Sequence, residues 1–143
     1  MRASAILHIL SVELIHRYRD SSLRIADLAA KCLTSTRTLS FICNRHFELP
    51  PSRLLRRYRL CALREEINRY PHRSLMVHLG DSGLPRNQRV ISQFAETFGV
   101  SIQDFKSACL RGRQKGLPRF PSACSQMIDR LMVYSLQCEC DSM

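Results

Sequence analysis

Apolar residues recur along most of the chain at intervals of three and four positions, which is the spacing of an amphipathic helix. No stretch alternates apolar and polar residues in the way a half-buried strand would. The pattern therefore predicts an all-α fold. It places helices near residues 6–18, 25–32, 35–47, 52–69, 75–79, 85–98, 101–110 and 127–136.

Residues that cap or break helices lie between these segments and set their expected ends. Ser35 is a favourable N-cap for the third helix. The Pro50-Pro51 pair stops that helix and can begin the fourth, because proline is tolerated in a first helical turn. Unbroken helical spacing predicts one long helix from Pro51 to Tyr70, before Pro71. By the same reasoning, the sixth helix is expected to begin at Pro85.

Two segments, residues 25–51 and 75–101, share one plan. Each has a short helix, a tight turn, a second helix with one polar face, and then a stop. The polar faces of the two second helices carry basic, amide and hydroxyl side chains. These are Thr36, Arg37, Ser40, Asn44 and Arg45 in the first segment, and Arg86, Asn87, Gln88, Arg89 and Ser92 in the second.

These residue types suit the major groove of double-stranded DNA. Arginine can bridge two guanine acceptors, asparagine and glutamine can bridge adenine, and hydroxyl groups serve bases or phosphates. One such face alone would be explained more simply as a solvated helix surface. Two faces in a repeated plan favour DNA, and so does the formal net charge of +10, all of it contributed by residues 1–113.

The long fourth helix adds a geometric reason. About 18 residues make a rod of about 27 Å, and successive major grooves on one side of DNA lie about 34 Å apart. A reading unit at each end of the rod could therefore enter neighbouring grooves. Arginines surround this helix, and some are expected to meet phosphates while others pair with Glu65 and Glu66. They are Arg53, Arg56, Arg57, Arg59, Arg64, Arg69 and Arg73.

The two motifs, in this order, resemble the DNA-binding domain of the AraC family of bacterial transcription regulators. The first motif is carried by Leu28-Ala29, residues 35–39, Leu49-Pro50-Pro51 and residues 54–60. The second is carried by residues 83–88, Phe94, residues 98–101 and Phe105-Lys106, so the resemblance covers about residues 3–110.

The resemblance implies two helix-turn-helix subdomains of homeodomain-like type, joined by a linker helix. The expected boundaries are residues 1–50, 51–70 and 71–112, followed by a linker and tail helix of unassigned role over 113–143. It also implies regulation of transcription, commonly activation by contact with RNA polymerase. By position, the base-reading residues would be Thr36, Arg37, Ser40, Asn44, Arg86, Asn87, Arg89 and Ser92.

Several positions depart from the family pattern. Leu33 and Glu48 stand where the family usually has glycine, and Ile102 stands where it has proline. The second motif departs further, with Gly80 inside its short helix, Gln93 at an inward position and Glu96 on a face that is normally basic. We therefore expect the first unit to dominate sequence recognition. The family's usual ligand-sensing domain has no counterpart here, so the chain resembles the members that consist of the DNA-binding domain alone.

Other classes of function find less support. The five histidines have no paired carboxylates for acid–base work, no glycine-rich phosphate loop is present, and we expect neither an enzyme nor a cofactor. A soft metal at Cys124, Cys138 and Cys140 is a weaker alternative. The main alternative is an interaction module with a degenerate DNA-binding fold that binds another regulator or RNA polymerase.

The compartment follows from the cysteines and from the N-terminal segment. Seven cysteines, an odd number with no small-domain disulfide framework, favour a reducing environment. The apolar run from Ala3 to Ile15 is too short and too polar to span a bilayer, and no cleavage site follows it. A cytoplasmic protein is therefore expected.

Overall fold

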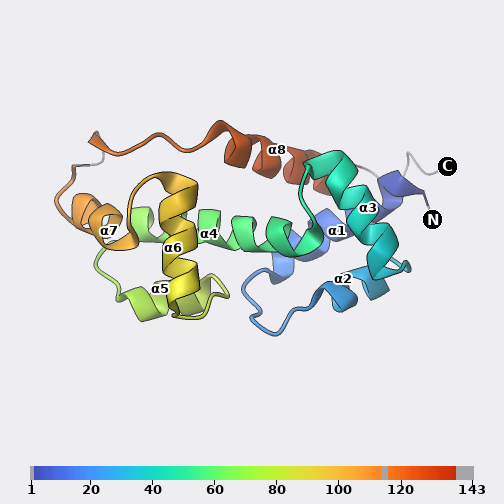
Figure 1. Ribbon diagram of the computed structural model, residues 1–143, viewed down its shortest axis with the longest axis horizontal. Helices are drawn as coiled ribbons and strands as arrows, with labels where there is room; N and C mark the ends of the chain where they lie inside the picture. Colours follow the sequence, from blue (N-terminus) through green and yellow to red (C-terminus); the bar gives the residue numbers. More distant parts are fainter. Residues whose placement is uncertain (1, 114–115, 138–143) are drawn as a thin grey trace.

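The computed structural model describes residues 2–113 and 116–137, and this part of the chain is all α-helical (Figure 1). The expectation of helices without strands is therefore confirmed for the described residues. The helices are α1 (Ala3–Arg17), α2 (Ile25–Lys31), α3 (Thr36–Phe47), α4 (Pro51–Arg69), α5 (Leu75–Asp81), α6 (Gln88–Phe98), α7 (Ile102–Leu110) and α8 (Ser122–Leu136).

Most helix ends follow the local chemistry of the sequence. The Ser35 side chain accepts a hydrogen bond from the Thr38 backbone N–H and so caps α3. Ser74 and Ser101 cap α5 and α7 in the same way. Pro51 is the first residue of α4, where its missing N–H costs nothing. The long fourth helix was thus predicted correctly at both ends.

The start of α6 differs from the sequence prediction. The helix begins at Gln88, so Pro85, Arg86 and Asn87 belong to the preceding turn. Asn87 is the N-cap, with extended backbone angles, and its Oδ1 accepts the Val90 N–H at 2.9 Å. Asparagine is among the strongest N-caps, and it prevails over the proline signal two residues earlier. The prediction of a helix from Pro85 was therefore wrong by three residues.

Helix α4 is the centre of the fold. It runs through the middle of the molecule in Figure 1, with α1 and α3 near its N-terminal end and α5, α6 and α7 near its C-terminal end. Its buried side chains are Pro51, Leu54, Leu55, Arg59, Leu60, Cys61, Leu63 and Ile67. Because they occupy nearly every side of the helix, both halves of the molecule share one hydrophobic core through α4.

Helix α8 packs mainly on α1 and also contacts α4. The Tyr134 carbonyl oxygen lies 2.9 Å from Nδ1 of His8, and the Tyr134 ring meets the Phe47 ring edge-on at 5.7 Å. Arg130 donates a hydrogen bond to the His46 carbonyl at 3.0 Å. These contacts make the C-terminal helix part of the core that α1 and α3 share.

No helix in the described residues combines the length and apolar character that a bilayer crossing requires. The N-terminal apolar segment instead forms α1, where Ile6, Leu7, Leu10 and Leu14 are buried in the core.

Candidate nucleic-acid interface

The two helices that carry the candidate residues begin on the same side of the molecule. In Figure 1, α3 and α6 both start at the lower edge, beside α2 and α5, and both run upward. Helix α8 lies along the opposite edge. The N-terminal ends of α3 and α6 therefore face the same direction, away from α8, and carry the positive ends of their helix dipoles.

Helix α3 buries one apolar stripe and exposes most of its polar residues, with Phe41 as an exposed apolar exception. Leu39, Ile42, Cys43 and Phe47 are buried, whereas Thr36, Arg37, Asn44 and Arg45 are exposed and Ser40 is half-buried. No acidic residue interrupts this face. The Asn44 amide donates one hydrogen bond to the Ser40 carbonyl at 2.8 Å, which leaves its second N–H and its Oδ1 for an outside partner.

The second candidate group lies around the start of α6. Arg86, Gln88 and Arg89 are exposed there, and Ser92 is half-buried one turn further along. Asn87 is exposed as well, but its Oδ1 is engaged by the cap described above. The structure brings Arg86, Gln88 and Arg89 together at the N-terminal end of α6. Asn87 instead caps that helix.

Two departures seen in the sequence have visible structural effects in α6. Gln93 is half-buried as expected, and its Oε1 is enclosed without a hydrogen-bond partner in the described residues. Such an unsatisfied polar atom weakens local packing. Glu96 is exposed and adds a negative charge to the helix. The helix pair α5–α6 is therefore less well packed and less basic than the helix pair α2–α3.

Arg56 of α4 and Arg89 of α6 form a positively charged cluster. Burial lowers the pKa of Arg56, and the charge of Arg89 lowers it further. The Nη1 atom of Arg56 is buried without a hydrogen-bond partner, and neither arginine makes an ion pair within the described residues. Two neighbouring guanidinium groups without a carboxylate suit a phosphate oxygen. No sequence pattern links positions 56 and 89, so the sequence predicts Arg56 only as one of the arginines around this helix.

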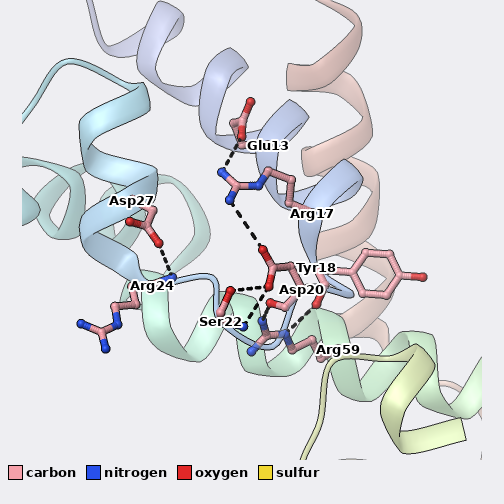
Figure 2. Close-up of polar contacts among 8 residues, drawn as sticks. All are labelled: Glu13, Arg17, Tyr18, Asp20, Ser22, Arg24, Asp27 and Arg59. Atoms are coloured by element: carbon pink, nitrogen blue, oxygen red, sulfur yellow. Dashed lines mark hydrogen bonds and ion pairs between the residues drawn. The ribbon is translucent and has the colours of Figure 1, made fainter. Parts of the chain in front are cut away.

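Two other arginines of α4 are engaged by contacts within the protein. Arg59 is buried and donates hydrogen bonds to the carbonyl oxygens of Tyr18 at 2.8 Å and Asp20 at 2.7 Å (Figure 2). Arg64 donates to the Pro118 carbonyl, and its guanidinium lies 5.0–5.3 Å from three phenylalanine rings. Neither arginine forms an ion pair with Glu65 or Glu66 within the described residues, because Arg59 binds backbone carbonyls and Arg64 lies against a carbonyl and aromatic rings.

The two glutamates of α4 do pair with arginines, as the sequence suggested. Glu65 lies 3.1 Å from Arg69, and Glu66 lies 3.9 Å from both Arg73 and Arg19. These side chains are largely exposed on the arginine side, so each pair contributes little to stability. Their main effect is to neutralise one end of α4, which leaves Arg53, Arg56 and Arg57 as the basic end.

Arg59 also connects the two helix pairs. The carbonyls that it binds belong to the turn between α1 and α2, where Asp20 accepts hydrogen bonds from Ser22 (Figure 2). Gly83, between α5 and α6, has φ +71°, and a Cβ there would lie 2.4 Å from the Tyr18 carbonyl oxygen and 3.0 Å from Nε of Arg59. The turn before α6 therefore rests directly against the turn before α2, which fixes the two pairs relative to each other.

Metal binding has no structural support in the described ranges, where no group of three suitable ligands occurs. Two of the cysteines named as ligands, Cys138 and Cys140, lie outside the described residues. Cys124 itself is buried in α8, against α4.

Comparison of the chain with known protein families, curated proteins and solved structures found no match. The candidate interface is therefore defined by its own side chains. Its elements are the exposed face of α3, the N-terminal end of α6, and the Arg56–Arg89 cluster that adjoins α6.

Proposed function

We propose that the protein binds double-stranded DNA sequence-specifically and regulates transcription, as the resemblance to the AraC family implies. In this proposal α2–α3 and α5–α6 are helix-turn-helix units, and α3 and α6 are the helices that enter the major groove. The observation that carries the proposal is the common direction of α3 and α6, whose N-terminal ends expose basic and amide side chains on one side of the molecule.

The dimensions of α4 support two simultaneous contacts. Its 19 residues correspond to a rod of about 28 Å. Major grooves on one face of DNA recur about every 34 Å. Because the Arg59 and Gly83 contacts hold the helix pairs in place, the protein would meet DNA as a nearly rigid body, and a modest bend of the DNA would close the remaining difference.

Charge supports the same partner. The net charge of +10 favours a polyanion. The Arg56–Arg89 cluster offers donors for a backbone phosphate between the two reading helices. Phosphate contacts of this kind set the register of a protein on DNA. Arg37, Asn44 and Gln88 are the side chains that we expect to read bases.

A second function is favoured by two exposed apolar side chains. Leu33 is 79% exposed in the turn before α3, and Phe41 is 66% exposed on α3 itself. Both would suit a protein surface, as an interaction module would require. Apolar side chains on a reading helix can equally contact thymine methyl groups. At Leu33 and Phe41 the two functions therefore predict different partners, a protein surface or DNA bases.

The test is selection of bound sequences from a random duplex pool, followed by binding of the best site at several salt concentrations. We expect an enriched motif and a log–log salt slope of about −0.9 per phosphate contact. Arg37→Ala should weaken the selected site by about 1–3 kcal/mol and relax preference at one base pair. The matched control is Arg119→Ala, an exposed arginine in the segment that leads to α8.

The outcomes separate the two functions. No enrichment, together with a flat salt response, would contradict DNA binding and favour the interaction module. An equal loss for Arg37→Ala and Arg119→Ala would contradict the placement of base reading on α3.

A further inference from the structure

A cavity of about 820 Å³ lies among parts of the fold that are distant in the sequence. Side chains of α4 form one wall, and the others come from the turn after α1, from α7, and from the segment 117–120 with α8. This volume falls within the range of about 300–1,000 Å³ that small-molecule sites occupy. The cavity shares no residue with the proposed DNA contacts on α3, α6 and the Arg56–Arg89 cluster, so it would be a separate site.

Aromatic and aliphatic side chains form much of the cavity wall. They are Tyr18, Tyr58, Phe105, Leu117, Phe120 and Ile128. All of these except Phe105 are only half-buried, so the protein leaves part of each side chain uncovered. Aromatic rings pack favourably on one another edge-on or offset, with centroids about 4.5–7 Å apart. The wall therefore suits the aromatic part of a small molecule.

Arg64 places a positive charge among these rings. Its guanidinium carbon lies 5.0 Å, 5.1 Å and 5.3 Å from the ring centroids of Phe98, Phe105 and Phe120. Nη2 donates to the Pro118 carbonyl at 2.9 Å, whereas Nη1 is buried without a hydrogen-bond partner in the described residues. No carboxylate there forms an ion pair with Arg64. A half-buried charge without a counter-charge is costly, and an anion in the cavity would supply one.

The two carboxylates that line the cavity do not neutralise Arg64. Glu65 lies 3.1 Å from Arg69, and Glu66 lies 3.9 Å from Arg19. Each of these acidic side chains already has an arginine as its partner. The charge that remains in the cavity is therefore positive, and the cavity should prefer an anion to a cation.

We propose that this cavity binds a small aromatic carboxylate, whose ring packs against Tyr58 and Phe120 and whose carboxylate pairs with Arg64. The planar guanidinium of arginine matches the geometry of a carboxylate. The rings around Arg64 keep water away from the ion pair, which strengthens its electrostatic attraction. The ligand would bridge α4 and the segment that leads to α8.

The experiment titrates naphthoate, an aromatic carboxylate, into the folded full-length protein and follows the fluorescence of the naphthalene ring. The protein contains no tryptophan, so its own emission interferes little. We expect saturable binding at one site. Naphthalenemethanol keeps the ring system and lacks the charge. It should bind at least about tenfold more weakly, because it cannot form the charge-assisted hydrogen bond with Arg64.

Substitutions of Arg64 test the position of the anion. Arg64→Gln should weaken naphthoate binding about tenfold or more. Arg64→Lys should retain part of the affinity, because it keeps the charge and loses the planar fork. The matched control is Arg111→Gln, an exposed arginine at the end of α7 that does not line the cavity, and it should bind naphthoate as the wild type does.

A second pair of variants decides the question if Arg64 is needed for folding. Leu117 is half-buried in the cavity wall and precedes Pro118, whose carbonyl binds Arg64. Leu117→Glu adds a carboxylate that can pair with Arg64 and repel the ligand, so naphthoate binding should be lost. Leu117→Gln has nearly the same shape without the charge and should keep most of the affinity. Circular dichroism of each variant shows whether it is folded.

The proposal fails on any of three results. The first is no saturable binding of naphthoate to the folded wild type at millimolar concentration. The second is equal affinity for naphthoate and naphthalenemethanol, which would mean that the cavity takes up apolar rings without recognising an anion. The third is unchanged naphthoate binding in folded Arg64→Gln or in folded Leu117→Glu, which would place the anion elsewhere on the protein.

Discussion

Single residues hold the turns of this protein in conformations that their side chains disfavour. Leu33 has φ +54° and Glu48 has φ +60°, so both adopt the left-handed conformation that glycine occupies most easily. They stand on either side of α3, at the two positions where the resembled family usually has glycine. The strain that the sequence suggested for Leu33 is confirmed by its positive φ.

Replacing Leu33 with glycine should therefore stabilise the protein. The left-handed conformation costs a non-glycine residue about 1–2 kcal/mol, and Leu33 loses little packing because it is 79% exposed. Glycine also loses more conformational entropy on folding, which offsets part of this gain. We therefore expect the free energy of unfolding to rise by about 0.5–1 kcal/mol. Urea denaturation measures it. Leu33→Ala keeps a side chain in the left-handed conformation, so an equal gain in stability for that variant would contradict the explanation.

For Gly83 we expect the opposite effect, a loss of stability when a side chain is added. A Cβ at this residue would lie 2.4 Å from the backbone oxygen of Tyr18, in addition to the strain of φ +71°. We expect Gly83→Ala to lower the free energy of unfolding by about 2–4 kcal/mol. Gly112→Ala is the matched control, because φ is +66° there with nothing within 4 Å of the new Cβ, and it should cost about 1 kcal/mol. Equal losses in the two variants would mean that the contact with Tyr18 is unimportant.

At the scale of elements, the sequence determined most helix boundaries because caps and prolines are local signals. Ser35, Pro51 and Ser101 mark helix starts without help from the rest of the fold. The start of α6 was missed because two start signals, Pro85 and Asn87, compete within three residues. Only the capping bond to Val90 decides between them.

The candidate site was less accessible from sequence. Periodicity treats every arginine as polar and exposed, so it could not separate buried Arg59 and half-buried Arg64 from the basic residues that remain at the surface. Their partners are backbone carbonyls and aromatic rings that are distant in the chain. The exposure of the α3 residues, in contrast, followed directly from the position of the apolar stripe.

The contribution of helix α8 to the stability of the fold can be measured with two neighbouring substitutions. Leu131 is fully buried against the core, whereas its neighbour Met132 is 45% exposed. Leu131→Ala should lower the free energy of unfolding by about 2–5 kcal/mol, and Met132→Ala should change it by less than about 0.5 kcal/mol. Equilibrium denaturation in urea checks both. A loss for Leu131→Ala no larger than that for Met132→Ala would show that α8 is not part of the folded core.

At the scale of the whole molecule, the two helix pairs differ in quality. The first has a buried apolar stripe on α3 and no acidic residue on the exposed face of that helix. The second contains the unsatisfied Gln93 and the exposed Glu96, and one of its candidate base readers, Asn87, caps its own helix. If the protein reads DNA, the two units should contribute unequally to recognition.

Footprints of Arg37→Ala and Arg89→Ala on a selected site test this inequality. We expect Arg37→Ala to lose discrimination at one base pair, by about 1–3 kcal/mol. Arg89→Ala, which removes one member of the Arg56–Arg89 cluster, should weaken specific and random DNA to a similar degree. A larger loss of discrimination in Arg89→Ala would reverse the assignment of the two units. Both arginines are exposed, so neither change should alter folding.

The contact between α1 and α8 also determines when the chain can finish folding. About one hundred residues separate the end of α1 from the start of α8. At ordinary rates of synthesis, α1 leaves the ribosome about 5–20 s before its partner. During that interval the side of α1 that α8 will cover is open to water and to other chains. Helix α1 therefore reaches its final packing only after α8 has been synthesised.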